Sequence, residues 1–166
     1  MCSLRDYIVV IPARAGSKRI VYKNNQKIGE KSLVEWAIDC ALTVFTKNQI
    51  VLVTDSEKSK ETGLQFGVEV LRRPAKISTS SSSSESVIKF VMKYYPSEKY
   101  VLLQPTSPFR IRSDLIACID QFEKSSARSI MSVTLPWSAP KDLYAPSIEI
   151  DGSFIPKKIL PEQEGQ

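Results

Sequence analysis

Hydrophobic residues fall into short continuous runs that alternate along the chain with amphipathic stretches. Each run is apolar at several successive positions or rich in β-branched residues, and is bounded by polar or turn-forming residues. This pattern predicts strands, most of them buried on both faces. The predicted strands are YIVVIPA (7–13), QIVLVTD (49–55), VEVL (68–71), KYVLLQPT (99–106) and SIMSVTL (129–135).

The stretches between the runs carry apolar residues at helical spacing. In SLVEWAIDCALTVF (32–45), Leu33, Trp36, Ala37 and Cys40 share one face, and Ser32 is placed to cap the helix. Further helices are predicted over residues 56–66, ended by Gly67, over 84–95, capped by Ser84, and over 113–125, capped by Ser113.

Alternating strands and helices predict an α/β fold, with a doubly wound, mostly parallel sheet covered by helices on both faces. Ligands of such sheets bind beyond the carboxyl ends of the strands, where the loops gather. The most unusual segments of the chain are expected there. They are the basic loop after the first strand, the TDS corner (54–56) and the QPTSPFR loop (104–110).

Composition narrows the class of protein. The chain has 166 residues, 42% of them hydrophobic, which is enough for one globular domain with a substantial core. No apolar run is long enough to span a bilayer, and no secretory leader is visible, so we expect a cytoplasmic protein that binds no membrane. The three cysteines are scattered and predict neither disulfides nor a metal site.

The formal net charge of +5 favours an anionic partner. Because the densest cations lie in one loop, whereas the rest are mixed with acids, we expect a compact anion and no nucleic acid. The loop ARAGSKRIVYKNN (13–25) combines small residues, which let backbone N–H groups approach an anion, with side chains that neutralise phosphate. Its cations are Arg14, Lys18, Arg19 and Lys23.

Each of these segments also has a simpler interpretation. The basic loop contains neither a Walker A motif nor a Rossmann glycine pattern, and a solvated surface loop is the alternative. The serine-rich segment 72–86 is either a flexible linker or a loop folded over a nucleotide, with Arg73 and hydroxyls at its base or ribose. The segment LLQPTSPFR (102–110) is either an ordinary turn or a rim that Pro105 and Pro108 stiffen.

Together these segments resemble the acylneuraminate cytidylyltransferases, the synthetases of CMP-activated sialic acids, and their legionaminic and pseudaminic acid relatives. IPARAGSKRIVYKN is similar to the family's ARxGSKxIPxKN, and VTDS to its STDS. LRRPAKI followed by serines is similar to RPAxLAxDxxSS, and VLLQPTSPFR to LLQPTSPLR. The resemblance extends from about Ile8 to Thr134 and implies a Rossmann-like nucleotidyltransferase sandwich.

The resemblance also implies a reaction and a set of site residues. The anomeric hydroxyl of a nonulosonic acid would attack the α-phosphorus of CTP, giving CMP-sugar and pyrophosphate. The motif position of Asp55 has no assigned role. The implied residues are Arg14 and Lys23 as catalytic contacts to the CTP phosphates, Ser17 and Lys18 beside them, Asn24, Arg73 and Ser84 at ribose and cytosine, and Gln104 near the sugar.

The chain departs from the family pattern at several positions. Val21 replaces a proline, Ser80 replaces an aspartate, and Thr106 stands where related nucleotidyltransferases carry an aspartate, so no metal ligand is identified although the family implies Mg²⁺. The family also implies a homodimer. We expect a nucleotide-binding domain over 1–145 and, over 146–166, an incomplete dimerisation and sugar-side hairpin with a turn at Asp151 and Gly152.

The C-terminal part therefore looks truncated relative to the family. Two alternatives to a sialic-acid-type synthetase remain open. One is a truncated homologue that binds CTP without turning it over, and the other is a cytidylyltransferase for another sugar acid, such as 3-deoxy-manno-octulosonate.

Overall fold

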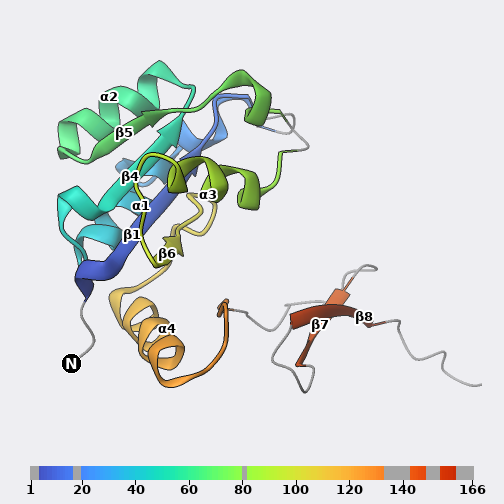
Figure 1. Cartoon of the computed structure of the whole chain (residues 1–166). Coiled ribbons are helices and arrows are strands. Elements are labelled where there is room, and N and C mark those ends of the chain that lie inside the picture. Colours follow the sequence, from blue (N-terminus) through green and yellow to red (C-terminus); the bar gives the residue numbers. More distant parts are fainter. Residues whose placement is uncertain (1–3, 17–19, 80–81, 133–142, 149–153, 160–166) are drawn as a thin grey trace, which may run out of the picture. The chain divides into compact units, whose positions relative to one another are not determined.

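The computed structural model describes residues 4–16, 20–79, 82–132, 143–148 and 154–159. Its chain divides into two compact units, Met1–Leu115 and Ile116–Gln166. The first unit contains a central sheet with helices around it (Figure 1). Nothing in this division tests the predicted boundary at residue 145, which stays a prediction.

The central sheet is four-stranded and entirely parallel, with strand order β5-β4-β1-β6. The predicted positions are confirmed within one residue at each end for the first three of these strands along the chain, whereas the strand predicted over 99–106 ends at Leu102, four residues early. β1 lies in the middle because its run of apolar residues is buried almost throughout. The strands are β1 (Tyr7–Ala13), β4 (Ile50–Thr54), β5 (Glu69–Arg72) and β6 (Lys99–Leu102).

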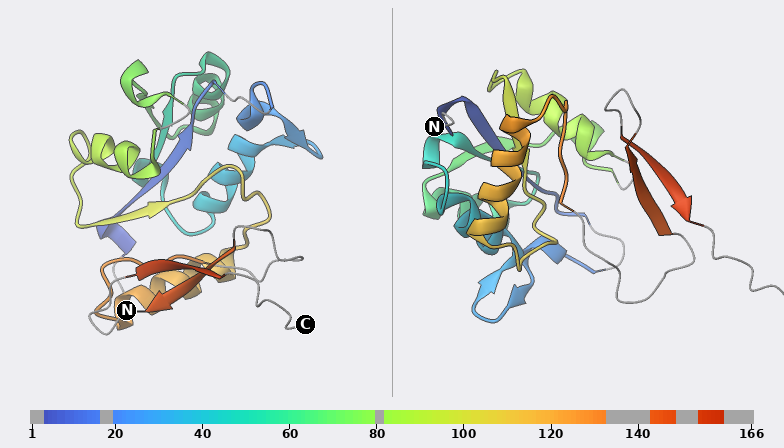
Figure 2. Two further views of the ribbon diagram at one scale, coloured as in Figure 1. Left: turned by 90° about the vertical axis from the view of Figure 1, so that its right-hand side faces the viewer. Right: turned by 90° about the horizontal axis from the view of Figure 1, so that it is seen from below.

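Helices cover both faces of this sheet, as the doubly wound pattern predicts (Figure 2). On one face, Val87 and Val91 of α3 (Ser84–Met92) pack against Val10, Val51 and Val53 of the strands. Helices α1 (Leu33–Leu42) and α2 (Glu57–Phe66) contact each other. In addition, α1 contacts β1, and α2 contacts β4. The core is therefore split by the sheet into two apolar layers.

The helix ends follow the local sequence. Ser32 caps α1 in a capping box with Glu35: the Glu35 N–H donates to Ser32 Oγ, and the Ser32 N–H donates to the Glu35 carboxylate. Hydrogen bonding of the Glu35 carboxylate to Ser32 lowers the pKa of this carboxyl. Gly67 ends α2 with φ of 70°, a left-handed conformation that glycine adopts without strain.

Two predicted caps are wrong. The cap of α3 is Ser83, whose extended backbone lets its Oγ accept from the Ser86 N–H, so Ser84 is the first helical residue. In a run of serines every residue has the same capping chemistry, and only the backbone selects one. Helix α4 (Arg112–Lys124) begins before Ser113, which therefore lies in its first turn.

The remaining elements are short or belong to the C-terminal part. Strands β7 (Leu143–Ile148) and β8 (Phe154–Ile159) form the predicted antiparallel pair, and its predicted turn at Asp151 and Gly152 lies outside the described residues. Residues 129–132 form no strand, and the rest of the strand predicted there also lies outside the described residues. The short elements are β2 (Lys27–Ile28), β3 (Lys31–Ser32) and the 3₁₀ turns η1 (Leu4–Asp6), η2 (Lys23–Asn25), η3 (Lys47–Gln49) and η4 (Ala75–Ile77).

Two negative features complete the description. Within the described ranges, no helix has the length and apolarity that a bilayer crossing requires. Cys40 and Cys118 are free thiols.

Gly63 sets the distance between α2 and the sheet. A Cβ at this position would lie 2.7 Å from Val70 Cγ2 and 2.8 Å from Leu52 Cδ2. We expect Gly63→Ala to lower the free energy of unfolding by about 1–3 kcal/mol through overpacking, despite the better helix propensity of alanine. Chemical denaturation measures this change. Gln65→Ala, at an exposed position of the same helix, is the control; equal stability of the two variants would contradict the close packing.

Candidate functional site

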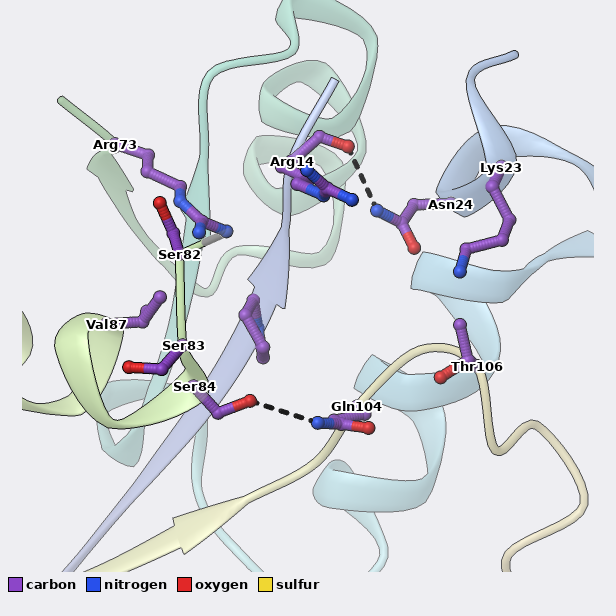
Figure 3. Close-up of a pocket in the computed structure, with 11 residues that line it drawn as sticks. Arg14, Lys23, Asn24, Arg73, Ser82, Ser83, Ser84, Val87, Gln104 and Thr106 are labelled. Atoms are coloured by element: carbon purple, nitrogen blue, oxygen red, sulfur yellow. Dashed lines mark hydrogen bonds between the residues drawn. The ribbon is translucent and has the colours of Figure 1, made fainter. Parts of the chain in front are cut away.

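A polar cleft of about 190 Å³ opens at the carboxyl end of β1 (Figure 3). Three segments that are distant in sequence form it: the basic loop after β1, the region from β5 to the start of α3, and the loop after β6. The lining residues are Pro12, Arg14, Lys23, Asn24, Arg73, Ser82, Ser83, Ser84, Val87, Gln104 and Thr106.

The corner after β4 connects these segments. Thr54 is buried, and its Oγ1 donates to the Ala13 carbonyl at 2.5 Å while accepting from the Ser56 N–H at 3.0 Å. The Thr54 carbonyl in turn accepts from the Arg73 N–H at 2.8 Å. Thr54 is therefore hydrogen-bonded both to the end of β1 and to the backbone of Arg73.

The same corner holds both ends of the basic loop. At the start, the Ala15 N–H donates to Asp55 Oδ1 at 2.6 Å. At the end, Asn25 is buried, and it donates to Ser59 Oγ at 3.0 Å and accepts from Ser56 Oγ at 3.4 Å. Asn25 thus anchors the loop to the first turn of α2.

Within the loop, two further side-chain hydrogen bonds hold the backbone. Asn24 is buried and donates from Nδ2 to the Arg14 carbonyl at 3.0 Å, which joins the two ends of the loop. Gln26 donates from Nε2 to the Val21 carbonyl at 3.1 Å. Tyr22 has φ of 50°, and after this left-handed residue the chain enters η2, from which Lys23 extends toward the cleft (Figure 3).

Two guanidinium groups rest on backbone carbonyls at the other side of the cleft. Arg14 Nη1 donates to the Thr79 carbonyl at 2.9 Å. Arg73 donates to the Ile77 carbonyl from Nε, at 2.8 Å, and from Nη2. Because neutral carbonyls do not neutralise the guanidinium groups that donate to them, both arginines remain available to an anion.

Arg73 is the most buried cation of the site, with 5% of its surface exposed. Burial lowers the pKa of its guanidinium, the Asp55 carboxylate raises it, and the positive charge of Arg14 lowers it again. An arginine nevertheless stays protonated at neutral pH. The cleft therefore holds mutually repelling positive charges that a bound anion would stabilise.

Hydroxyl and amide groups form the remaining wall. Gln104 Nε2 donates to Ser84 Oγ at 3.1 Å, which joins the loop after β6 to the start of α3 (Figure 3). Arg110 Nη2 donates to the Gln104 carbonyl at 3.3 Å. The side chains of Gln104 and Ser84 offer neutral donors and acceptors of the kind that ribose, base and sugar hydroxyls require.

Most of the site residues predicted from the sequence come together in this cleft. Arg14, Lys23, Asn24, Arg73, Ser84 and Gln104 all line it, whereas Ser17 and Lys18 lie outside the described residues. Their individual roles stay predictions.

Sequence reasoning missed other contributors. Ser82 and Ser83 line the cleft, and the serine run was a signal for them, although it did not indicate which members face inward. Nothing in the pattern marked Pro12 or Val87 as lining residues. The supporting roles of Thr54, Ser56 and Asn25 depend on contacts that only the fold creates.

The described lining contains no carboxylate. Across the described ranges, no group of three or more His, Cys, Asp or Glu side chains is arranged to hold a metal ion. The described lining residues therefore offer a divalent cation amide and hydroxyl oxygens but no carboxylate ligand.

Comparisons with known proteins agree with the motifs. The family model for cytidylyltransferases matches residues 8–146. The chain is 33% identical to the N-acylneuraminate cytidylyltransferase of Escherichia coli O18:K1:H7 (strain RS218 / NMEC) over 129 residues, which cover 76% of the chain and 31% of that protein. It is 32% identical over 163 residues to the CMP-N,N'-diacetyllegionaminic acid synthase of Legionella pneumophila (strain Philadelphia 1), covering 95% of the chain and 69% of that protein.

Solved structures share the fold. A CMP:2-keto-3-deoxy-manno-octonic acid synthetase complexed with CTP superposes with a TM-score of 0.62 and 22% identity, covering 73% of the chain and 48% of that chain. Rv0371c of Mycobacterium tuberculosis H37Rv, complexed with manganese, gives a TM-score of 0.52 and 13% identity, covering 72% of the chain and 60% of that chain. The chain thus spans about half the length of these neighbours and 31% of the E. coli relative.

The buried hydroxyl of Thr54 provides a test of the corner. Thr54→Val keeps the shape of the side chain but leaves the Ala13 carbonyl and the Ser56 N–H without this partner. We expect the free energy of unfolding to fall by about 1–3 kcal/mol, the usual cost of unsatisfied buried groups. Thr62→Val, on α2, is the control, because its Oγ1 donates to the Lys58 carbonyl at an exposed position. A Thr54→Val variant with the stability of the wild type would contradict the role of the Thr54 hydrogen bonds in holding the corner together.

Proposed function

The chain belongs to the cytidylyltransferase family, and we propose that it binds CTP in the polar cleft and transfers CMP to a sialic-acid-like nonulosonic acid, with release of pyrophosphate. One observation carries the proposal: Arg14 and Lys23 of the basic loop and Arg73, which is distant from them in sequence, converge on one cleft at the end of β1. This concentration of positive charge suits a nucleoside triphosphate.

The proposed reaction is a displacement at the α-phosphorus. The anomeric oxygen of the sugar forms a bond to this phosphorus, the bond from the phosphorus to the bridging oxygen breaks, and the hydroxyl proton leaves to solvent or a base. The electron pair departs with pyrophosphate. Arg14 and Lys23 are proposed to neutralise the charge that develops on the leaving phosphates, since phosphoryl transfer depends mainly on positioning and electrostatic stabilisation.

The remaining lining residues are proposed to bind the neutral parts of the substrates. Asn24, Arg73 and Ser84 are assigned to ribose and cytosine, and Gln104 to the sugar. The hydrogen bond from Gln104 to Ser84 supports a shared boundary between nucleoside and sugar. Ser17 and Lys18, outside the described residues, are proposed to contribute to phosphate binding from the same loop.

The names of the relatives support the substrate class. One relative is named for N-acylneuraminate and one for N,N'-diacetyllegionaminic acid, and both sugars are nonulosonic acids. A cytidylyltransferase for another sugar acid is the second candidate, because the neighbour complexed with CTP is named for 2-keto-3-deoxy-manno-octonic acid. Since CTP is an intracellular nucleotide, we propose that the chain acts in the cytoplasm.

We also propose Mg²⁺ as the cofactor, supported by the family resemblance and by the neighbour complexed with manganese. A divalent cation bound with CTP would supply further neutralisation of the phosphate charge. The described lining offers no carboxylate ligand for it. This feature favours a binding-only homologue as the alternative to an active enzyme.

Pyrophosphate release distinguishes these functions. We expect the chain, mixed with CTP, Mg²⁺ and N-acetylneuraminate or N,N'-diacetyllegionaminate, to release pyrophosphate in a coupled phosphate assay. The same mixture with 3-deoxy-manno-octulosonate tests the second sugar class. CTP binding without release from any sugar would support the binding-only alternative, whereas the absence of CTP binding would reject the proposed site.

Arg14→Ala tests the phosphate contact. We expect CTP affinity to fall by about 10- to 100-fold, since hydrogen bonds to charged groups contribute about 1.5–3 kcal/mol, while stability changes little because the side chain is only partly buried. Calorimetry measures the affinity. Arg72→Ala is a matched control, because Arg72 is exposed and adjacent in sequence to Arg73 but does not line the cleft. Unchanged CTP affinity in Arg14→Ala would remove Arg14 from the site.

A further inference from the structure

Asp55 is the acidic residue of the TDS corner, and the proposed reaction gives it no role. It is exposed and does not line the cleft. Its Oδ1 instead accepts a short hydrogen bond, 2.6 Å, from the Ala15 N–H. A hydrogen bond to an ionised carboxylate is stronger than one between neutral groups, so this contact is able to fix the backbone that it touches.

The backbone in question is the peptide unit between Arg14 and Ala15. Its N–H belongs to Ala15 and donates to Asp55, whereas its C=O belongs to Arg14 and accepts from Asn24 Nδ2 at 3.0 Å. Because a peptide unit is planar, two partners on its opposite edges determine the orientation of the whole plane. That plane sets the direction in which the Arg14 side chain leaves the backbone.

Asp55 is itself held firmly. The residue before it, Thr54, is buried and bonded to Ala13, Ser56 and Arg73, and the residue after it, Ser56, is buried and caps α2. The carboxylate is thus presented from a rigid corner. This rigidity separates Asp55 from an ordinary surface acid, whose side chain is free to follow its partner.

The charge of Asp55 also matters to the cleft. Arg14 and Arg73 repel each other, and the Asp55 carboxylate interacts favourably with Arg73, which supports the pKa of that guanidinium. Because Asp55 does not line the cleft, its negative charge offsets part of this repulsion without occupying the space that an anion would fill. The carboxylate therefore acts on the backbone of one arginine and on the charge of the other.

We infer that Asp55 is a positioning residue, which fixes the Arg14–Ala15 peptide and thereby directs Arg14 toward the phosphates of the bound nucleotide. The inference rests on the proposed function, since the nucleotide is its ligand. Asp55 is assigned no contact with the substrates and no metal.

Asp55→Ala and Asp55→Asn test this role, with Asp120→Ala as the control, because Asp120 pairs with Lys124 on α4 and lines no part of the cleft. Calorimetry on folded variants, checked by circular dichroism, measures the affinities for CTP and for CMP. We expect Asp55→Ala to lower CTP affinity about tenfold and CMP affinity by less than about threefold, because the outer phosphates depend on Arg14. Asp55→Asn keeps an acceptor oxygen and should stay within about threefold of the wild type for CTP.

The ratio of CTP to CMP affinity is the decisive readout, because a purely structural contribution of Asp55 would change both affinities together. A folded Asp55→Ala variant with the wild-type ratio would overturn the inference. An Asp55→Ala variant with wild-type affinity for both CTP and CMP would also overturn the inference.

Hydrogen exchange of the Ala15 amide in the ligand-free chain provides a second measurement, which needs no folded alanine variant. We expect protection in the wild type and in Asp55→Asn, although the residue is only partly buried. Exchange at the rate of a free amide in the wild type would overturn the inference. A wild-type chain that bound no CTP would reject the proposed function instead, while the exchange result would still decide whether Asp55 holds the peptide.

Discussion

The hydrogen bonds of the β4 corner are the constraint on which the site depends. Thr54, Asp55 and Ser56 are consecutive, and each one bonds to a different part of the basic loop or to the end of β1. A polar loop at the edge of a sheet would otherwise lose conformational entropy on ordering without compensation. The corner directly follows β4, a strand that is buried at every position. Its hydrogen bonds therefore fix the loop to the rigid core.

This rigidity allows like charges to be held together. Arg14, Lys23 and Arg73 line one cleft, and no described lining residue is a carboxylate. In water such cations would separate, but here each is attached to a different element of the sheet or its loops. The charge repulsion is partly offset by Asp55, which lies outside the cleft, so the interior keeps a net attraction for anions.

Much of this arrangement could be predicted from the sequence, for identifiable reasons. The buried strands were predictable because each one is a continuous apolar run. Their loops were expected at one edge because the carboxyl ends of parallel strands lie together. Arg14, Lys23, Arg73 and Gln104 were predictable because motifs fix their chemistry. The residue that caps α3 could not be predicted from the sequence, because neighbouring serines are chemically equivalent. The hydrogen bond between Asn25 and Ser59 could not be predicted either, since this buried polar pair depends on the packing of residues that are 34 positions apart.

The resting partners of the two arginines have an evolutionary consequence. Arg14 and Arg73 are held by the main-chain oxygens of Thr79 and Ile77. Every amino acid supplies such an oxygen, so mutation at positions 77 and 79 preserves the acceptors as long as the chain path is kept. A change of side chain at position 77 therefore leaves the acceptor of Arg73 in place, whereas the side chain of Thr79 has a second partner, because its Oγ1 is hydrogen-bonded to Ser82 Oγ of the cleft at 2.8 Å.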